Sequence, residues 1–313
     1  MPHQLILGTR PSKMAVMMAQ TAKARLEAAY SGLTVEVRTY ASTGDTNQGD
    51  LKKIGGKGAF VKDLELRLLS GEIDCAIHAL KDVPGDVDMH PDLEMTCFFE
   101  REDPRDALIM REGLALPTDG AGLTLATSSP RRKAFLHRLY PQAKIIPLRG
   151  NVDTRMRKLA EAQFDGMVLS YAGLHRLGLQ SHASHVYSAE EMLPAVGQGV
   201  MSLQVRKADA QKCAFLKVVH SSSTDRAVSA ERRLLRVLEG NCYAAIAGHC
   251  IEGNGMRQLE AWVSDPEGRE WLTTTCQQAS ADDPAALGEQ AARELLARGA
   301  RRLIDAEPLS SVS

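Results

Sequence analysis

The sequence predicts an α/β protein with two similar lobes, followed by a smaller α+β domain. Apolar strands alternate with helices twice along the chain, two strand-to-helix turns resemble each other, and the pattern changes from residue 222 onward. At about 100–200 residues per domain, 313 residues suffice for two or three domains. We expect one lobe from residues 1–99 and 200–217, the second from 100–199, and the third domain from 218–313.

The first lobe begins with a strand–helix–strand unit, which predicts a parallel sheet. Residues 5–7 form a short apolar strand, residues 14–30 carry an apolar stripe at helical spacing, and residues 33–40 alternate between apolar and polar side chains. The remaining elements expected in this lobe are a helix over 60–70, a strand over 73–80 and a returning strand over 200–205.

The second lobe repeats this alternation, and the third domain departs from it. In the second lobe we expect strands over 123–126, 144–147 and 166–170, with helices over 132–139 and 152–162. In the third domain we expect a helix over 227–239, a hairpin of strands 259–263 and 270–275, and a last helix from 283 to near 299.

Composition and charge exclude several classes of protein. Hydrophobic residues make up 44% of the chain and charged residues 25%, which is typical of folded soluble proteins and excludes long disorder. A net charge of −1 argues against a protein that binds nucleic acid through an overall positive charge. The sequence contains no apolar run long enough to span a bilayer, and its start has no secretory signal pattern, so we expect a cytoplasmic protein.

The numbers and spacing of arginines and cysteines indicate which kinds of binding site this chain can form. The chain has 25 Arg against 13 Lys, which indicates a small polyanionic ligand or else a compositional habit of the genome. Its six cysteines are thinly spread, which predicts reduced thiols and no disulfide framework. Cys75 with His78, and His249 with Cys250, are isolated pairs, so we expect no structural zinc site.

Two segments look like copies of one strand-to-helix turn. Residues 7–15 (LGTRPSKMA) overlay residues 126–134 (ATSSPRRKA), and both place Thr or Ser together with Arg where a strand ends and a helix begins. Free backbone N–H groups at a helix start bind anions. Ordinary N-capping by Ser or Thr is the alternative for either turn alone, whereas two such turns favour anion binding in a cleft between similar lobes.

The glycine-rich stretch over residues 42–58 fails the test for a phosphate-binding loop. Such a loop ending in Gly56-Lys57 requires glycine at position 51 and Ser or Thr at 58, where this chain has Leu51 and Gly58. Gly197-Gln198-Gly199 likewise lacks the third glycine of a dinucleotide fingerprint. We interpret residues 42–58 as a mobile lid with Lys57 as its charged contact.

Charged side chains follow the predicted strands at the positions where open α/β sheets bind ligands. Lys81-Asp82 comes directly after the strand over 73–80, where a carboxylate stabilises a developing cation or carries protons, or else forms an exposed turn. Cys242 follows the helix-ending Gly240, so it is either an accessible thiol or a structural cysteine. Arginines at strand ends and helix starts indicate a shared cleft: Arg131, Arg132, Arg149, Arg155 and Arg176.

These segments together resemble the porphobilinogen deaminase family, also called hydroxymethylbilane synthases, nearly from end to end. The matching blocks are GTRPSKMA (8–15), STGD (42–45), IGGKGAFVKDLE (54–65), AIHALKDVP (76–84), EREDPRDAL (100–108), TSSPRRKAFL (127–136), LRGNVDTR (148–155), AGLHRLGL (172–179), LPAVGQG (193–199) and LEGNC (238–242).

The resemblance implies three domains, of which the first two are doubly wound and resemble periplasmic-binding-protein lobes. It also implies a dipyrromethane cofactor, held through a thioether to Cys242. On this primer four porphobilinogen molecules are joined head to tail, four ammonia molecules leave, and hydrolysis releases hydroxymethylbilane for tetrapyrrole and heme biosynthesis. A monomer is implied, and Asp82 matches the family's catalytic aspartate. The matching cofactor- and substrate-binding positions are Arg10, Ser12, Lys57, Phe60, Lys81, Thr127, Ser128, Ser129, Arg131, Arg132, Arg149, Gly150, Arg155, Arg176 and Gln198.

The chemistry of porphobilinogen agrees with this residue set. Each molecule carries an acetate and a propionate, so a growing chain gathers carboxylates that arginines would bind. Loss of ammonia leaves an electron-poor ring, which the Asp82 carboxylate would stabilise as positive charge develops. One block departs from the family pattern, since residues 240–245 read GNCYAA where the family has Gly-Gly-Cys, a polar residue, Val and Pro. A non-catalytic organic-anion binder and a degenerate paralogue that does not load the cofactor are therefore the alternatives.

Overall fold

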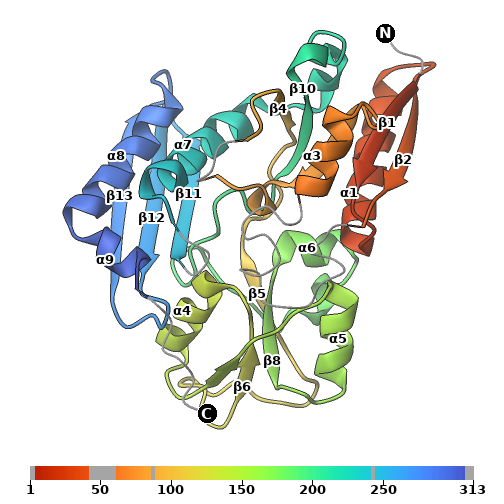
Figure 1. Cartoon of the computed structure of the whole chain (residues 1–313). Coiled ribbons are helices and arrows are strands. Elements are labelled where there is room, and N and C mark those ends of the chain that lie inside the picture. Colours follow the sequence, from red (N-terminus) through yellow and green to blue (C-terminus); the bar gives the residue numbers. More distant parts are fainter. Residues whose placement is uncertain (1–3, 42–60, 86–88, 241–243, 307–313) are drawn as a thin grey trace. The chain divides into compact units, whose positions relative to one another are not determined.

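The described part of the chain contains three β-sheets, whose strands can be followed in Figure 1. The structure is a computed structural model that describes residues 4–41, 61–85, 89–240 and 244–306. It divides into two units: unit 1 holds residues 1–102 and 199–226, and unit 2 holds residues 103–198 and 227–313. One five-stranded sheet lies in unit 1, and a second five-stranded sheet and a three-stranded sheet lie in unit 2.

The sheet of unit 1 has the strand order β2-β1-β3-β10-β4. Its strands are β1 (Gln4–Thr9), β2 (Thr34–Thr39), β3 (Cys75–Ala79), β4 (Leu93–Phe98) and β10 (Met201–Arg206). The predicted parallel pairing is confirmed where β1 meets β2 and β3, but β10 runs antiparallel to both of its neighbours. A strand that runs parallel to its neighbour needs a long crossover connection, usually a helix. The chain re-enters unit 1 at Gly199, only two residues before β10, so this unit holds no such crossover ahead of the strand.

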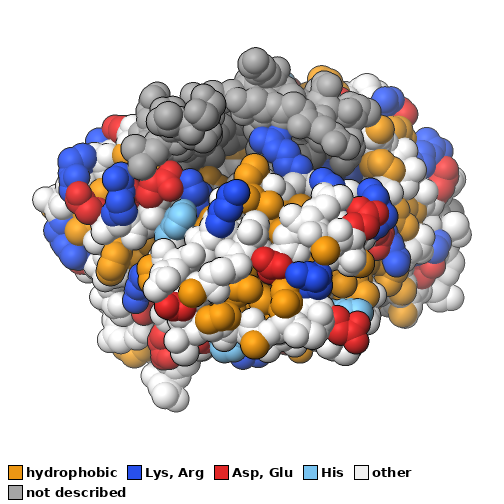
Figure 2. All heavy atoms as spheres, turned by 90° about the horizontal axis from the view of Figure 1, so that it is seen from below, with side chains coloured by type: hydrophobic (Ala, Val, Ile, Leu, Met, Phe, Trp, Pro, Cys, Tyr) orange, Lys and Arg blue, Asp and Glu red, His pale blue; other side chains and the backbone are white. Residues whose placement is uncertain are grey.

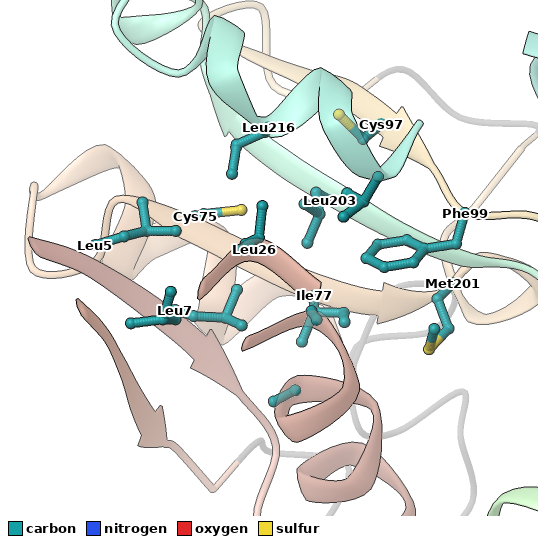
Figure 3. Close-up of a cluster of buried hydrophobic side chains, with 14 of the residues drawn as sticks. Leu5, Leu7, Leu26, Cys75, Ile77, Cys97, Phe99, Met201, Leu203 and Leu216 are labelled. Carbon is teal, nitrogen blue, oxygen red and sulfur yellow. The ribbon is translucent and has the colours of Figure 1, made fainter. Parts of the chain in front are cut away.

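Helices cover both faces of this sheet, so the doubly wound prediction is confirmed. Helix α1 (Lys13–Ala29) packs on one face together with Cys75 and Ile77, whereas α3 (Lys62–Leu69) packs on the other face with Ala76. The alternation follows from the period of two along β3. Figure 3 shows the α1 side, where side chains from β1, β3, β10 and α1 meet in one apolar cluster.

The first sheet of unit 2 has the order β7-β6-β8-β5-β9 and repeats this design. Its elements are β5 (Asp106–Met110), β6 (Thr124–Ala126), α4 (Pro130–Leu139), β7 (Lys144–Ile146), α5 (Val152–Ala160), β8 (Gly166–Ser170), α6 (Tyr171–Arg176) and β9 (His185–Val186). Strands β6, β7 and β8 are parallel, and β5 runs antiparallel between β8 and β9. Helix α4 covers one face, and α5 and α6 cover the other.

The third sheet is antiparallel and confirms the predicted α+β domain. Its elements are α7 (Ser222–Leu238), β11 (Ala245–Gly253), β12 (Met256–Ser264), β13 (Trp271–Ala279), α8 (Pro284–Ala297) and α9 (Ala300–Ile304). One face packs against α7, α8 and α9. On the other face Trp262 stacks on Phe135 of α4, with ring centroids 4.2 Å apart. This sheet therefore supports α4, the helix that carries Arg131 and Arg132 in its first turn.

Several predicted boundaries were wrong. Helix α7 begins five residues before the predicted start, and α4 begins at Pro130 because Ser129 caps it. Strands β4, β5, β9 and β11 were not predicted. Among the described residues, no helix is long and apolar enough to cross a membrane. On the face drawn in Figure 2, positive, negative and hydrophobic side chains are interspersed, in line with the net charge of −1.

Candidate functional site

One edge of the unit 1 sheet carries the predicted catalytic aspartate. Strands β1 and β3 are parallel neighbours, so their carboxyl ends meet at the same edge. Arg10 follows β1 directly, while Lys81 and Asp82 lie in the single turn η1 (Leu80–Asp82) that follows β3. Both side chains of the Lys81-Asp82 pair are exposed, and Arg10 is half-buried. The structure thus brings these three predicted residues to one edge.

Ser12 sits at the same edge as the N-cap of α1. Its hydroxyl oxygen accepts a hydrogen bond from the N–H of Ala15 at 3.3 Å. The hydroxyl of Thr9 donates to the carbonyl oxygen of Ala15 at 3.1 Å, which closes the turn between β1 and α1. Capping therefore explains Ser12 locally, but a capping hydroxyl still carries a proton that it can donate to a ligand oxygen.

A buried histidine lies beside this edge and was not among the predicted site residues. Nε2 of His78 lies 2.9 Å from Oε1 of Gln204, whose Nε2 donates to Oε1 of Glu65 at 2.9 Å. Burial lowers the pKa of His78 to about 4, the Gln204 bond and the Asp82 carboxylate oppose that shift, and Arg10 adds to it. The one signal in the sequence was a polar residue inside an otherwise apolar strand.

The corresponding edge of unit 2 gathers the predicted hydroxyl residues. Ser129 caps α4 and accepts from the N–H of Arg132 at 3.4 Å, and Thr127 accepts from the N–H of Ser129 at 3.2 Å. Ser128 accepts from the N–H of Leu148 at 3.0 Å, which ties the turn after β6 to the turn after β7. These hydroxyls hold the two turns in place at the carboxyl edge of β6 and β7.

The two turns that look alike in sequence do not align residue for residue in the structure. The overlay paired Ser129 with Arg10, whereas the structure makes Ser129 and Ser12 the equivalent N-caps. The overlay is therefore shifted by two residues at the helix starts, because the cap and not the proline sets where each helix begins. The shared feature, a capped helix start with arginine nearby, is retained.

Arg131 and Arg132 share one buried carboxylate. Nη2 of Arg131 lies 2.6 Å from Oδ2 of Asp106, and Nε and Nη2 of Arg132 lie 3.0 and 2.7 Å from Oδ1. Nη1 of Arg131 donates to the carbonyl oxygen of Leu193 at 2.7 Å, and Nη1 of Arg132 donates to that of Val168 at 3.0 Å. These bonds fix both guanidinium planes.

Gln198 joins the same cluster. Its Nε2 donates to the carbonyl oxygen of Pro104 at 2.7 Å and to Oδ1 of Asp106 at 3.1 Å, and its side chain is 1% exposed. The structure therefore brings together three predicted binding residues, Gln198, Arg131 and Arg132, around an acid that the sequence analysis did not select. Asp106 lay inside a matching block, but a lone acid in a charged stretch carried no further signal.

The remaining predicted residues of unit 2 lie in the segments that follow β7 and β8. Gly150 has φ +113°, and a Cβ there would lie 2.9 Å from Thr154 Cγ2, so glycine is required. Nε of Arg155 donates to the carbonyl oxygen of Gly150 at 2.8 Å. Arg149 is half-buried after β7, and Arg176 is half-buried at the end of α6. Lys57, Phe60 and Cys242 lie outside the described residues.

Comparison with known proteins decides the family. A family sequence model described as "Porphobilinogen deaminase, dipyromethane cofactor binding domain" matches residues 5–214, and "Porphobilinogen deaminase, C-terminal domain" matches residues 226–297. The chain belongs to the porphobilinogen deaminase family. The expected activity, hydroxymethylbilane synthesis in tetrapyrrole biosynthesis, and the expected dipyrromethane cofactor are thereby confirmed.

Curated relatives align over nearly the whole chain. Porphobilinogen deaminase of Thiobacillus denitrificans is 39% identical over 312 residues, covering 98% of this chain and 99% of the relative. Porphobilinogen deaminase 2 of Streptomyces coelicolor is 38% identical, covering 97% of each, and the Nitrobacter hamburgensis protein is 40% identical, covering 95% and 94%. Among solved structures, the periplasmic VFT2 domain of Bordetella pertussis BvgS and the methionine-binding protein MetQ are each 16% identical, with a TM-score of 0.44. They cover 74% of this chain, and 92% and 96% of their own.

The arginine cluster fits a carboxylate of the dipyrromethane that this family carries. Two guanidiniums face one carboxylate, so Arg131, Arg132 and Asp106 together hold a formal charge of +1 in a place where each is less than a tenth exposed. Among the described residues, the buried Nε of Arg131 has no hydrogen-bond partner. A buried excess charge and an unpaired donor both favour a bound anion, such as the acetate or propionate of a pyrrole ring.

The described cysteines are poor candidates for the thioether of a porphobilinogen deaminase. None of Cys75, Cys97, Cys213, Cys250 and Cys276 forms a disulfide bond, and all five are buried. Burial raises the pKa of Cys97, Cys213 and Cys276 to about 11 and raises that of Cys75 well above its ordinary value. The thiolate is the reactive form, so the raised pKa values disfavour these four sulfurs as nucleophiles near neutral pH.

Proposed function

We propose that this porphobilinogen deaminase catalyses condensation with Asp82 and binds substrate and primer carboxylates with the arginines of unit 2. The observation that carries the proposal is the buried Arg131–Asp106–Arg132 cluster, with its excess positive charge and its unpaired Nε. Each porphobilinogen adds two carboxylates, so a site for the growing chain requires fixed cations. The bound dipyrromethane supplies the pyrrole acceptor on which that chain is built.

Asp82 has the chemistry of the catalytic residue in this proposal. Its carboxylate is exposed at the carboxyl edge of the unit 1 sheet and is held on a turn that a rigid strand positions. Positive charge develops on the substrate ring as ammonia leaves, and a fixed carboxylate near the pyrrole N–H groups stabilises that charge. Arg10, Ser12 and Lys81, at the same edge, would bind the carboxylates of the incoming molecule.

Cys242 is the proposed attachment point of the primer. The five described cysteines are buried, and four of them have raised pKa values, which leaves Cys242 as the sulfur of choice. Its flanking elements belong to unit 2: α7 ends at Leu238, and β11 begins at Ala245, which packs in the same apolar cluster as Ala134 and Phe135 of α4. A primer bound to Cys242 would share a unit with the arginine cluster, which makes each coupling effectively unimolecular in the acceptor.

The other assignments complete the proposal. We assign three domains, residues 1–99 with 200–217, 100–199 and 218–313, acting as a cytoplasmic monomer. The free thiols of all five described cysteines support a reducing compartment, and size-exclusion chromatography with light scattering tests the monomer. The further binding residues would be Lys57, Phe60, Thr127, Ser128, Ser129, Arg149, Gly150, Arg155, Arg176 and Gln198.

Intact-mass spectrometry of the purified protein tests the proposal most directly. We expect the wild type and Cys276→Ala to carry the added mass of two pyrrole rings and to stain with Ehrlich's reagent. Cys242→Ala should lack both the mass and porphobilinogen turnover. A fully active wild type with no covalent adduct would refute the attachment. Ligand binding that survives in Asp82→Asn and Cys242→Ala, with no turnover in any form, would instead identify an organic-anion binder.

A further inference from the structure

Asp106 is the most completely bonded acid at the edge of the unit 2 sheet. Its side chain has no exposed surface, and its two oxygens accept from Arg131, Arg132 and Gln198. Oδ2 takes the bond from Arg131, while Oδ1 takes two bonds from Arg132 and one from Gln198. The carboxylate therefore serves as the common acceptor for three residues of the proposed binding site.

The strand topology explains why this acid reaches the arginines. β5 runs antiparallel to β8, and its first residue, Asp106, pairs with Ser170 at the carboxyl end of β8. The start of β5 therefore lies at the same edge as the start of α4, which bears Arg131 and Arg132 as its second and third residues. A parallel β5 would place its first residue at the opposite edge, away from the pair.

The two guanidiniums need a shared counter-ion. They repel each other, and both are nearly buried, so water screens that repulsion poorly. Burial lowers the pKa of Arg131, the Asp106 charge opposes that shift, and the charge of Arg132 adds to it. Each guanidinium also donates to a main-chain oxygen, that of Leu193 or Val168, which carries no formal charge. Asp106 is thus the charged group that keeps the pair together.

We propose that Asp106 is a positioning residue that presents Arg131 and Arg132 as a single site of charge +1, matched to one carboxylate of a pyrrole ring. This inference rests on the proposed role of the arginines in holding the primer. Without Asp106 the pair would carry +2 and would lose its fixed orientation, so one carboxylate would no longer balance its charge. The Nε of Arg131 has no partner among the described residues, so it is one of the guanidinium N–H donors that these bonds leave over.

Chemical rescue separates the charge of Asp106 from its shape. Asp106→Ala removes the carboxylate and leaves room for formate, whereas formamide has the same shape without the charge. Expression in formate, followed by intact-mass and thermal-unfolding measurements of the full chain, reports primer loading and folding separately. Asp106→Asn keeps the shape and loses the charge, and Asp282→Asn, which changes an exposed acid in the same unit, is the control.

We expect Asp106→Asn and Asp106→Ala to unfold about 5–10 °C below the wild type, the scale expected for breaking a buried ion pair. Primer loading should fall at least about tenfold, in line with a loss of at least about 1.4 kcal/mol. Formate should restore both readouts in Asp106→Ala, and formamide should restore neither. Equal rescue by the two compounds, or wild-type loading in Asp106→Asn, would overturn the inference.

The two proposals fail in different ways. A wild type without any adduct would refute the proposed primer attachment, but the formate-dependent unfolding midpoint of Asp106→Ala would still report whether a charge is required between the arginines. A wild type that carries the adduct, together with an Asp106→Asn variant that carries it equally and unfolds at the same temperature, would refute the role of Asp106 alone.

Discussion

Nε2 of His78 and Oε1 of Gln204 lie 2.9 Å apart inside the unit 1 sheet, where both side chains are buried. The amide nitrogen of Gln204 donates to Glu65, so the amide oxygen must accept and His78 must carry its proton on Nε2. This arrangement holds the imidazole neutral three residues before Lys81. A neutral ring there leaves the negative charge of Asp82 available to the substrate.

His78 should make the protein less stable in acid. Its pKa is about 4 in the folded chain and about 6.5 in the unfolded chain, so the unfolded state binds more protons between these values. The free energy of unfolding therefore falls as pH drops through this window, by about 3 kcal/mol in total. Urea unfolding at pH 7, 5.5 and 4.5 should show a shallower acid loss in His78→Gln than in the wild type. The exposed His90→Gln is the control, and equal slopes in all three proteins would contradict the assignment.

Asp82→Asn should abolish most turnover without affecting the fold. The side chain is exposed, so the free energy of unfolding should change by no more than about 0.5 kcal/mol. Loss of a charge-stabilising group should lower kcat at least about 100-fold, measured as hydroxymethylbilane formed from porphobilinogen. Asp92→Asn, with a side chain 77% exposed, is the control. Turnover within about threefold of the wild type would rule out a catalytic role for Asp82.

Substitutions of Ser12 should separate helix capping from ligand binding. Ser12→Ala should lower the free energy of unfolding by about 1 kcal/mol, while Ser12→Asn and Ser12→Asp should retain the cap. If the hydroxyl also binds a carboxylate of the substrate, Ser12→Asp should raise the KM for porphobilinogen most strongly, because it places like charges together. A wild-type KM in Ser12→Asp would leave Ser12 with the capping role alone.

Gly268→Ala should destabilise the protein more than Gly255→Ala. Both glycines have positive φ, +72° and +73°, so both substitutions carry the same backbone strain. A Cβ at Gly268 would lie 2.3 Å from the carbonyl oxygen of Ala134, whereas nothing lies within 4 Å of one at Gly255. The difference between the two free energies of unfolding should be about 1–3 kcal/mol. Equal losses would mean that the turn at 265–268 yields without cost.

The strands that the sequence analysis missed include two that begin with small or charged residues. The strand over 245–253 reads AIAGHCIEG, in which alanine and glycine carry little strand preference, yet it forms the edge strand β11. Asp106 lies in the charged block over residues 100–108, and the strand β5 that it begins was not predicted. Their role depends on the antiparallel pairing of β5 with β8, which has no local signature in either segment. The start of α4 did carry a local signal, Ser129 followed by Pro130, although the helix was predicted to begin two residues later.

The sequence alone determined most strands and helices of both lobes, although not β4, β5, β9 or α6. It also determined the strand ends that bear Asp82 and the arginines, and the family, since hydrophobic periodicity, caps and motif blocks are local properties of the chain. Only the tertiary structure decided that Arg131 and Arg132 meet Asp106, 25 and 26 residues away, and that His78 is bonded to Gln204, 126 residues away. These pairings depend on strand order and direction. The order of strands in a sheet decides which groups lie next to a buried charge or imidazole and can bond to it. That order depends on the packing of the whole unit and not on any local segment.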